Sequence, residues 1–91
     1  MSMDKGEKIN LTSLLKLSLI YAITKDFENL KNLLNLPESL VNTLKKYKYN
    51  EMLIKAGLQY ILASLITIGK MPSAEEVENY IVTIRKALYG W

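Results

Sequence analysis

Apolar residues recur at spacings of three and four in five stretches of this chain, and this periodicity constrains the fold more than any other feature. No stretch alternates between apolar and polar residues with turn signals on both sides, so the sequence predicts no strand. The periodic stretches are residues 11–24, 27–35, 37–48, 51–68 and 74–89. Because the connections between them are short, we predict an all-α fold, a compact bundle of about five helices.

Residues with known end preferences bound these stretches. Asp26 and Asn50 are typical N-cap residues, and Ser73 with Glu76 has the spacing of a capping box. Glycines are expected to end the fourth and fifth helices in the left-handed conformation: Gly69 and Gly90. The helix boundaries are therefore predicted by side-chain chemistry as well as by periodicity.

With 91 residues and 10.4 kDa, the chain has room for one domain. We assign residues 10–91 to a single helical domain and residues 1–9, which show no periodicity, to a disordered N-terminal arm. The N-terminus is polar and mixed in charge, unlike a signal peptide, so a cytoplasmic location is expected. The longest apolar run, residues 56–69, is shorter than a bilayer-spanning helix and favours a buried helix over a membrane segment.

The chain contains no Cys and no His. It therefore lacks thiolate nucleophiles, the usual zinc ligands and the side chain that most often acts as a general base near neutral pH. Glu75, Glu76 and Glu78 resemble a carboxylate cluster, but capping and the helix dipole already explain the first two. We expect neither an enzyme nor a bound metal or other cofactor.

Two of the predicted helices, residues 11–24 and 51–68, are apolar around most of their circumference. A bundle of this size encloses only about one helix completely, and we expect the fourth helix at its centre. Gly57 is costly inside that helix, so it predicts a close crossing with another helix. One apolar face is then left for a partner, either a larger protein or a second copy of this chain.

The segment from Lys45 to Tyr49 alternates cations and aromatics. Four of its residues are candidates for nucleic-acid contact: Lys45, Lys46, Lys48 and Tyr49. The alternative is structural, because lysines in a last helical turn complement the dipole and Tyr47 falls on the core stripe. The net charge of +3 permits weak contact with nucleic acid without indicating it. A small helix-turn-helix-like DNA-binding regulator using this segment is the alternative function.

The chain ends in two large aromatics, Tyr89 and Trp91, separated by Gly90. They follow Leu88, the last position expected to be buried. Aromatics at a chain end are efficient anchors in a partner's pocket, so we predict that Tyr89 and Trp91 bind a partner. In the alternative, Trp91 folds back over its own bundle as a lid.

In its size, helical pattern and use of Lys, Ile, Leu and Tyr, the chain over residues 10–91 resembles the small all-helical subunit of the crenarchaeal B-family replicative DNA polymerase holoenzyme. The resemblance implies a non-catalytic accessory subunit that docks on an archaeal polymerase and stabilises the assembly in DNA replication. It carries over no individual functional residue. The dominance of Lys among the basic residues and the absence of Cys agree with a thermophilic source.

Overall fold

The computed structural model describes the backbone of residues 3–90 and the side chains of residues 12–90. Five helices and no strands occur in this part of the chain, which confirms the all-α prediction. The helices are α1 (Met3–Ile23), α2 (Phe27–Leu34), α3 (Glu38–Lys45), α4 (Glu51–Thr67) and α5 (Ala74–Tyr89).

The three predicted N-caps and the predicted glycine end of α5 are confirmed at atomic detail. Asp26 and Asn50 each accept a hydrogen bond from a backbone N–H in the first turn of the helix that follows. At α5, Ser73 and Glu76 form both hydrogen bonds of the capping box, at 3.0 and 3.1 Å. Gly90 has a φ of 78°, the left-handed conformation expected of a glycine that ends a helix.

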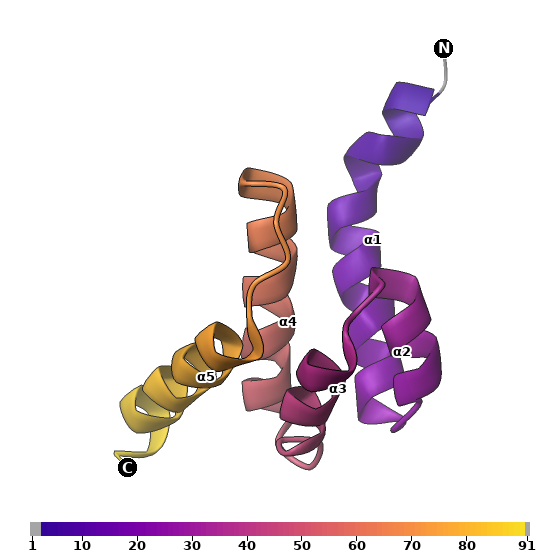
Figure 1. Ribbon diagram of the computed structural model, residues 1–91. Helices are drawn as coiled ribbons and strands as arrows, with labels where there is room; N and C mark the ends of the chain where they lie inside the picture. Colours follow the sequence, from indigo (N-terminus) through magenta and orange to yellow (C-terminus); the bar gives the residue numbers. More distant parts are fainter. Residues whose placement is uncertain (1–2, 91) are drawn as a thin grey trace.

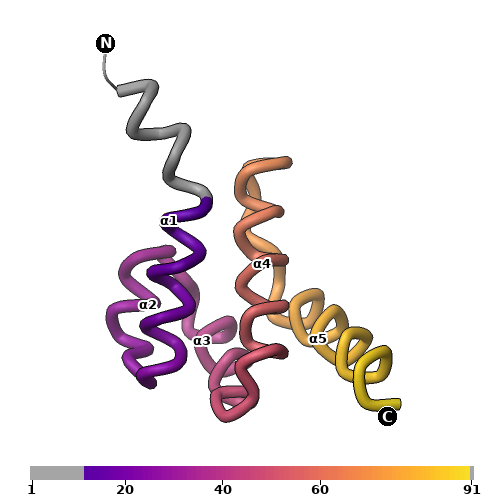
Figure 2. The backbone as a smooth tube through the Cα atoms, turned by 180° about the vertical axis from the view of Figure 1, so that it is seen from behind, coloured from indigo at the N-terminus to yellow at the C-terminus, as the bar shows by residue number. Residues whose placement is uncertain are grey.

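The helices pack in a closed order around one core: α1 against α2, α2 against α3, α3 against α5, α5 against α4, and α4 against α1. In Figure 1, α4 lies between α1 and α5, and α3 lies beside the lower end of α4, next to α2. The view from behind in Figure 2 shows the same order, with α1 and α5 on opposite sides of α4. The turns from α1 to α2 and from α3 to α4 lie at the same end of the bundle.

Helix α4 supplies the largest share of the buried residues, as expected for the central helix: Leu53, Ile54, Ala56, Gly57, Leu58, Ile61 and Leu62. Gly57 lies at a close crossing. A Cβ at this position would lie 2.9 Å from Cδ1 of Ile81 and 3.0 Å from Cδ2 of Leu44. The glycine therefore lets α3 and α5 approach α4, as its costly position inside a helix predicts.

Three expectations are corrected. Helix α3 ends at Lys45, so Lys46 and Lys48 lie in the following turn rather than in a last helical turn. Leu88, expected to be buried, is 47% exposed because the last turns of α5 extend beyond α4 (Figure 1). Helix α1 starts at Met3 rather than after residue 10, since a polar helical turn has no apolar side for periodicity to detect. Residues 1–2 lie outside the described residues, and whether residues 1–9 form a disordered arm in solution stays a prediction.

Within residues 3–90, no helix combines the length and the hydropathy needed to cross a lipid bilayer.

Candidate functional site

The outward side of α1 carries large aliphatic residues that remain exposed. Leu17, Ile20 and Ile23 are 38%, 55% and 39% exposed. They follow one another at a spacing of three, so they lie on one side of the helix, called here the α1 apolar side. On the opposite side, Ser18 and Ala22 are fully buried, and the Ser18 hydroxyl donates to the carbonyl of Leu14 at 2.6 Å. Helix α1 therefore presents apolar residues both to the core and to solvent.

A shallow groove of about 260 Å³ between α1 and α4 adds to the accessible apolar surface. Its lining is Leu15, Gln59, Leu62 and Ala63. Gln59 is the single polar side chain among these residues. The groove thus lies on the face where α1 and α4 meet, the two helices whose sequences are most nearly apolar all round.

The end of α5 forms a second apolar surface. Leu88 and Tyr89 are 47% and 45% exposed, so Tyr89 is accessible as a partner-binding residue requires. Trp91, the other predicted anchor, lies outside the described residues. The exposure of Leu88 enlarges the predicted aromatic surface by one aliphatic residue.

Tyrosines line a groove between α4 and α5. The rings of Tyr60 and Tyr80 stack with their centroids 4.9 Å apart and their planes 11° from parallel. Two adjoining hollows of about 310 and 150 Å³ share Tyr60 and Glu76 in their linings. Tyr60, like Tyr21 of α1, is half-buried against the core, whereas Tyr80 is 36% exposed. The larger hollow is also lined by Asn79 and Thr83. Two of its polar side chains already have partners within α5, because Glu76 serves the capping box and the Thr83 hydroxyl donates to the carbonyl of Asn79 at 2.9 Å.

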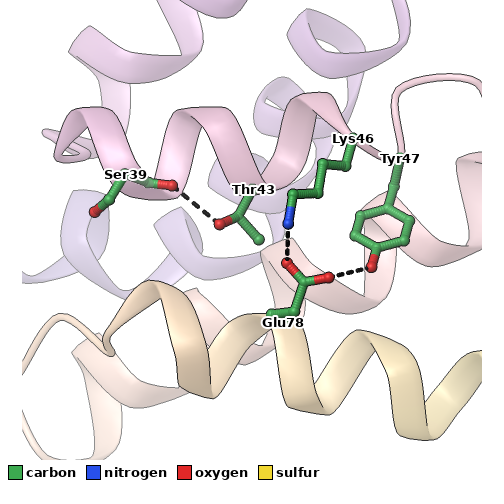
Figure 3. Close-up of polar contacts among 5 residues, drawn as sticks. All are labelled: Ser39, Thr43, Lys46, Tyr47 and Glu78. Carbon is green, nitrogen blue, oxygen red and sulfur yellow. Dashed lines mark hydrogen bonds and ion pairs between the residues drawn. The ribbon is translucent and has the colours of Figure 1, made fainter.

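The basic segment is divided between structural and exposed residues. Glu78 of α5 accepts from Lys46 Nζ at 2.8 Å and from the Tyr47 hydroxyl at 2.6 Å (Figure 3). This Glu78 cluster, made of Lys46, Tyr47 and Glu78, ties the α3–α4 turn to α5 across 31 and 32 positions of sequence. In the same view the Thr43 hydroxyl donates to the carbonyl of Ser39 within α3.

These contacts shift the pKa values of the cluster. Hydrogen bonds from Lys46 and then from Tyr47 lower the pKa of Glu78 below its ordinary value of 4.5. Burial, followed by the hydrogen bond to the Glu78 carboxylate, raises the pKa of Tyr47 to about 12. At neutral pH the cluster therefore holds a charged carboxylate between an ammonium group and a neutral phenol.

Among the large hydrophobic residues of the described side chains, Tyr49 is the most exposed, at 82%, and it lies among lysines from two turns. The ammonium nitrogens of Lys25 and Lys48 lie 4.8 and 5.2 Å from the centroid of its ring. The ammonium of Lys45 lies 5.9 Å from the centroid of Phe27, the first residue of α2. Three of the four predicted nucleic-acid residues, Lys45, Lys48 and Tyr49, therefore remain exposed or half-buried, whereas Lys46 is ion-paired.

Sequence reasoning did not include Lys25 in this set. It comes from the α1–α2 turn, 24 positions before Tyr49. A signal was present, because the first and third turns of an up-and-down bundle lie at the same end.

Among residues 12–90, no three acidic residues lie close enough together to hold a metal ion. Glu75 is in the first turn of α5, Glu76 completes the capping box and Glu78 binds Lys46 and Tyr47. Each carboxylate of the Glu75–Glu78 segment thus has a helix end or a polar contact to explain it.

No protein-family model, curated protein or solved structure shows significant similarity to this chain.

Proposed function

We propose that this chain is a non-catalytic accessory subunit that binds a larger protein through the α1 apolar side. The observation that carries the proposal is the exposure of Leu17, Ile20 and Ile23 on one side of a helix. Burying a fully exposed side chain of this kind contributes roughly 1.5–3 kcal/mol. Because these three are already about half-buried, a partner that covers them gains roughly half of that from each. Isolated exposed aliphatic residues are ordinary, but three on one helix side form a continuous surface.

The groove beside α4 supports the same reading. A partner side chain seated between Leu15 and Leu62 would be enclosed by apolar groups from two helices, which is the environment of an interface hot spot. Leu15 precedes Ser18 and Ala22 by three and seven positions, so the groove opens on the core-facing side of α1 and is a contact separate from the α1 apolar side.

The helix-turn-helix alternative requires α4 to enter a DNA groove. In the fold, α4 lies between α1 and α5 and buries most of its apolar residues (Figure 1). Its neighbours occupy the sides that a recognition helix would present to base edges. The geometry therefore favours protein binding over sequence-specific duplex recognition.

The resemblance makes a B-family replicative DNA polymerase from the native source the first partner to test, and DNA replication the process to which the subunit would belong. The test compares Ile20→Glu with the matched variant Ile68→Glu. Ile68 follows the last residue of α4, outside the α1 apolar side, and is 65% exposed. Ile20→Glu should weaken binding by at least about tenfold, since it places a charge in an apolar interface, and leave the melting temperature unchanged. Ile68→Glu should bind as the original protein does.

Three results would contradict the proposal. The first is equal binding by both variants, and the second is a catalytic activity that stays with the purified chain. The third is a homodimer in which the α1 apolar side is buried against a second copy of the chain. Sedimentation equilibrium decides the last, because a homodimer formed through α1 would dissociate to monomer in the Ile20→Glu variant. Failure to bind the polymerase alone removes that partner. The α1 interface is then tested on the protein that co-purifies with the chain.

A further inference from the structure

Figure 1 shows the turns after α1 and after α3 at one end of the bundle, and the residues there combine an exposed ring with several ammonium groups. We propose that Tyr49, Lys25, Lys45 and Lys48 form a site for single-stranded nucleic acid. In this site a base stacks on the Tyr49 ring and the three lysines contact phosphates. The site goes beyond the protein-binding function proposed above and uses none of the α1 apolar side.

Three elements supply the site. Lys25 comes from the α1–α2 turn, Lys45 from the end of α3, and Lys48 with Tyr49 from the α3–α4 turn. The ammonium groups of Lys25 and Lys48 lie within about 5 Å of the Tyr49 ring centroid, at 4.8 and 5.2 Å. The ammonium of Lys45 lies over Phe27, two residues after Lys25. Two cations therefore lie at the Tyr49 ring, and a third lies over the Phe27 ring beside the α1–α2 turn.

The ring is available to a base. At 82% exposure, most of the Tyr49 surface faces solvent. A cation–π contact at an exposed site is worth about 0.5–1 kcal/mol, whereas a base stacked on an aromatic side chain is worth about 1–3 kcal/mol. A base therefore displaces an ammonium from the ring face, and the flexible lysine side chain then reaches the adjoining phosphate.

The three lysines also keep their charge for a ligand, although the Lys25 ammonium donates to the carbonyl of Ile23 at 3.2 Å. Among residues 12–90, the lysines in ion pairs are Lys31 with Glu38 and Lys46 with Glu78, and none belongs to this site. The neighbouring Asp26 carboxylate accepts from the backbone and side-chain amides of Asn29 at the start of α2. Glu51 lies in the first turn of α4, where the helix dipole favours a carboxylate.

The chemistry favours a single strand over a duplex. In a duplex both faces of each internal base are already stacked, so an exposed ring gains nothing from it. A single strand presents free base faces beside its phosphates. If three phosphates are contacted, the slope of log affinity against log salt is about −2.1 for a single strand.

The experiment measures fluorescence anisotropy of a labelled oligothymidylate of about ten nucleotides, titrated with the full chain from about 50 to 200 mM salt. Tyr49→Ala should weaken binding at least about fivefold, and Tyr49→Phe should retain it because the ring remains. Lys25→Ala should weaken binding and reduce the salt slope by about 0.7, the share of one phosphate contact. Lys25→Ala best distinguishes the folded site from the basic segment 45–49 alone, because Lys25 is distant in sequence and lies beside Tyr49 in the fold.

Lys70→Ala is the matched control, because it removes the same charge from an exposed position beyond the far end of α4. It should leave the slope unchanged, and helicity should be the same for all variants. No binding at the lowest salt, or binding that Tyr49→Ala and Lys25→Ala leave intact, would overturn the proposal. So would tighter binding to a duplex of equal length or to vesicles containing phosphatidylserine. None of these outcomes bears on the protein-binding surface of α1.

Discussion

At the scale of single residues, Glu78 has the most far-reaching polar contacts described in this chain. Its carboxylate joins Lys46 and Tyr47, which stand more than thirty positions earlier in the sequence. Its side chain is 28% exposed, so solvent screens the ion pair less than it would a fully exposed one. The Glu78 cluster therefore contributes to stability rather than to ligand binding.

We predict that Glu78→Gln lowers the free energy of unfolding by about 1 kcal/mol at neutral pH, since the charge-assisted hydrogen bonds are lost while the shape is kept. Urea denaturation measures the effect. Glu38→Gln is the control: it breaks the more exposed pair with Lys31 and should change stability by less than about 0.5 kcal/mol. Equal losses of unfolding free energy in the two variants would show that the Glu78 cluster contributes no more to stability than the exposed pair of Glu38 and Lys31.

The pH dependence follows from the lowered pKa of Glu78. The folded state favours the charged carboxylate, so its contribution is complete above the ordinary value of 4.5 and is lost as the pH falls through the lower folded pKa. We therefore predict that the stability difference between the original protein and Glu78→Gln is constant near neutral pH and shrinks below about pH 4.5. Other carboxylates are common to both proteins and cancel. A difference that persists unchanged into strong acid would contradict the assignment.

Individual residues show how far sequence reasoning reaches. Periodicity marked Tyr47 as a core residue and left Tyr49 for the surface, and both assignments agree with the fold. The partner of Lys46 was not predictable, because Glu78 lies 32 positions away and several carboxylates were equally eligible. The same holds for Lys25 beside Tyr49, a contact that depends on how two turns meet.

At the scale of helices, local signals located the capped helix ends but did not determine which residues are buried. Asp26, Asn50 and Ser73 cap the helices they were expected to cap, because capping is a contact between residues two or three positions apart. Leu88 has the spacing of a buried residue on α5 but is exposed, since burial depends on whether another helix extends as far. Val77 and Ile81, earlier on the same helix, face α4 and are fully buried.

The crossing at Gly57 gives a prediction about how helices pack. Gly57→Ala gains about 1 kcal/mol of helix propensity, but its methyl group meets Ile81 at 2.9 Å and Leu44 at 3.0 Å, both fully buried. Because overpacking a close-packed core costs about 1–3 kcal/mol, we expect a net destabilisation of about 1 kcal/mol in urea denaturation.

Ile81→Val supplies the control for that variant, because it removes the Cδ1 atom that a methyl at position 57 would meet. The double variant Gly57→Ala with Ile81→Val should be more stable than the sum of the two single effects implies, which a double-mutant cycle measures. Strict additivity, or a stabilising Gly57→Ala, would show that α5 has room to move away from α4.

At the scale of the whole molecule, the apolar surface is divided between two sides. Helix α1 and the C-terminal end of α5 lie on opposite sides of α4, and each carries exposed large apolar residues (Figure 2). The sequence predicted that a bundle of this size leaves apolar surface uncovered, but only the packing order of the helices locates it. A single partner that contacted both sides would have to extend around the bundle.

The last prediction concerns the chain end. We expect that deleting Gly90 and Trp91 leaves helicity and melting temperature nearly unchanged, since Leu88 and Tyr89 just before them are already 47% and 45% exposed. Aromatic residues in an interface often contribute about 2 kcal/mol or more, so the same deletion should weaken binding of the native partner by at least about tenfold. Both quantities are measured on one truncated protein. Tyr89→Ala, which keeps the chain length, should weaken binding in the same direction. A large fall in melting temperature with binding intact would show instead that Trp91 covers the bundle as a lid, and partner binding would then rest on α1 alone.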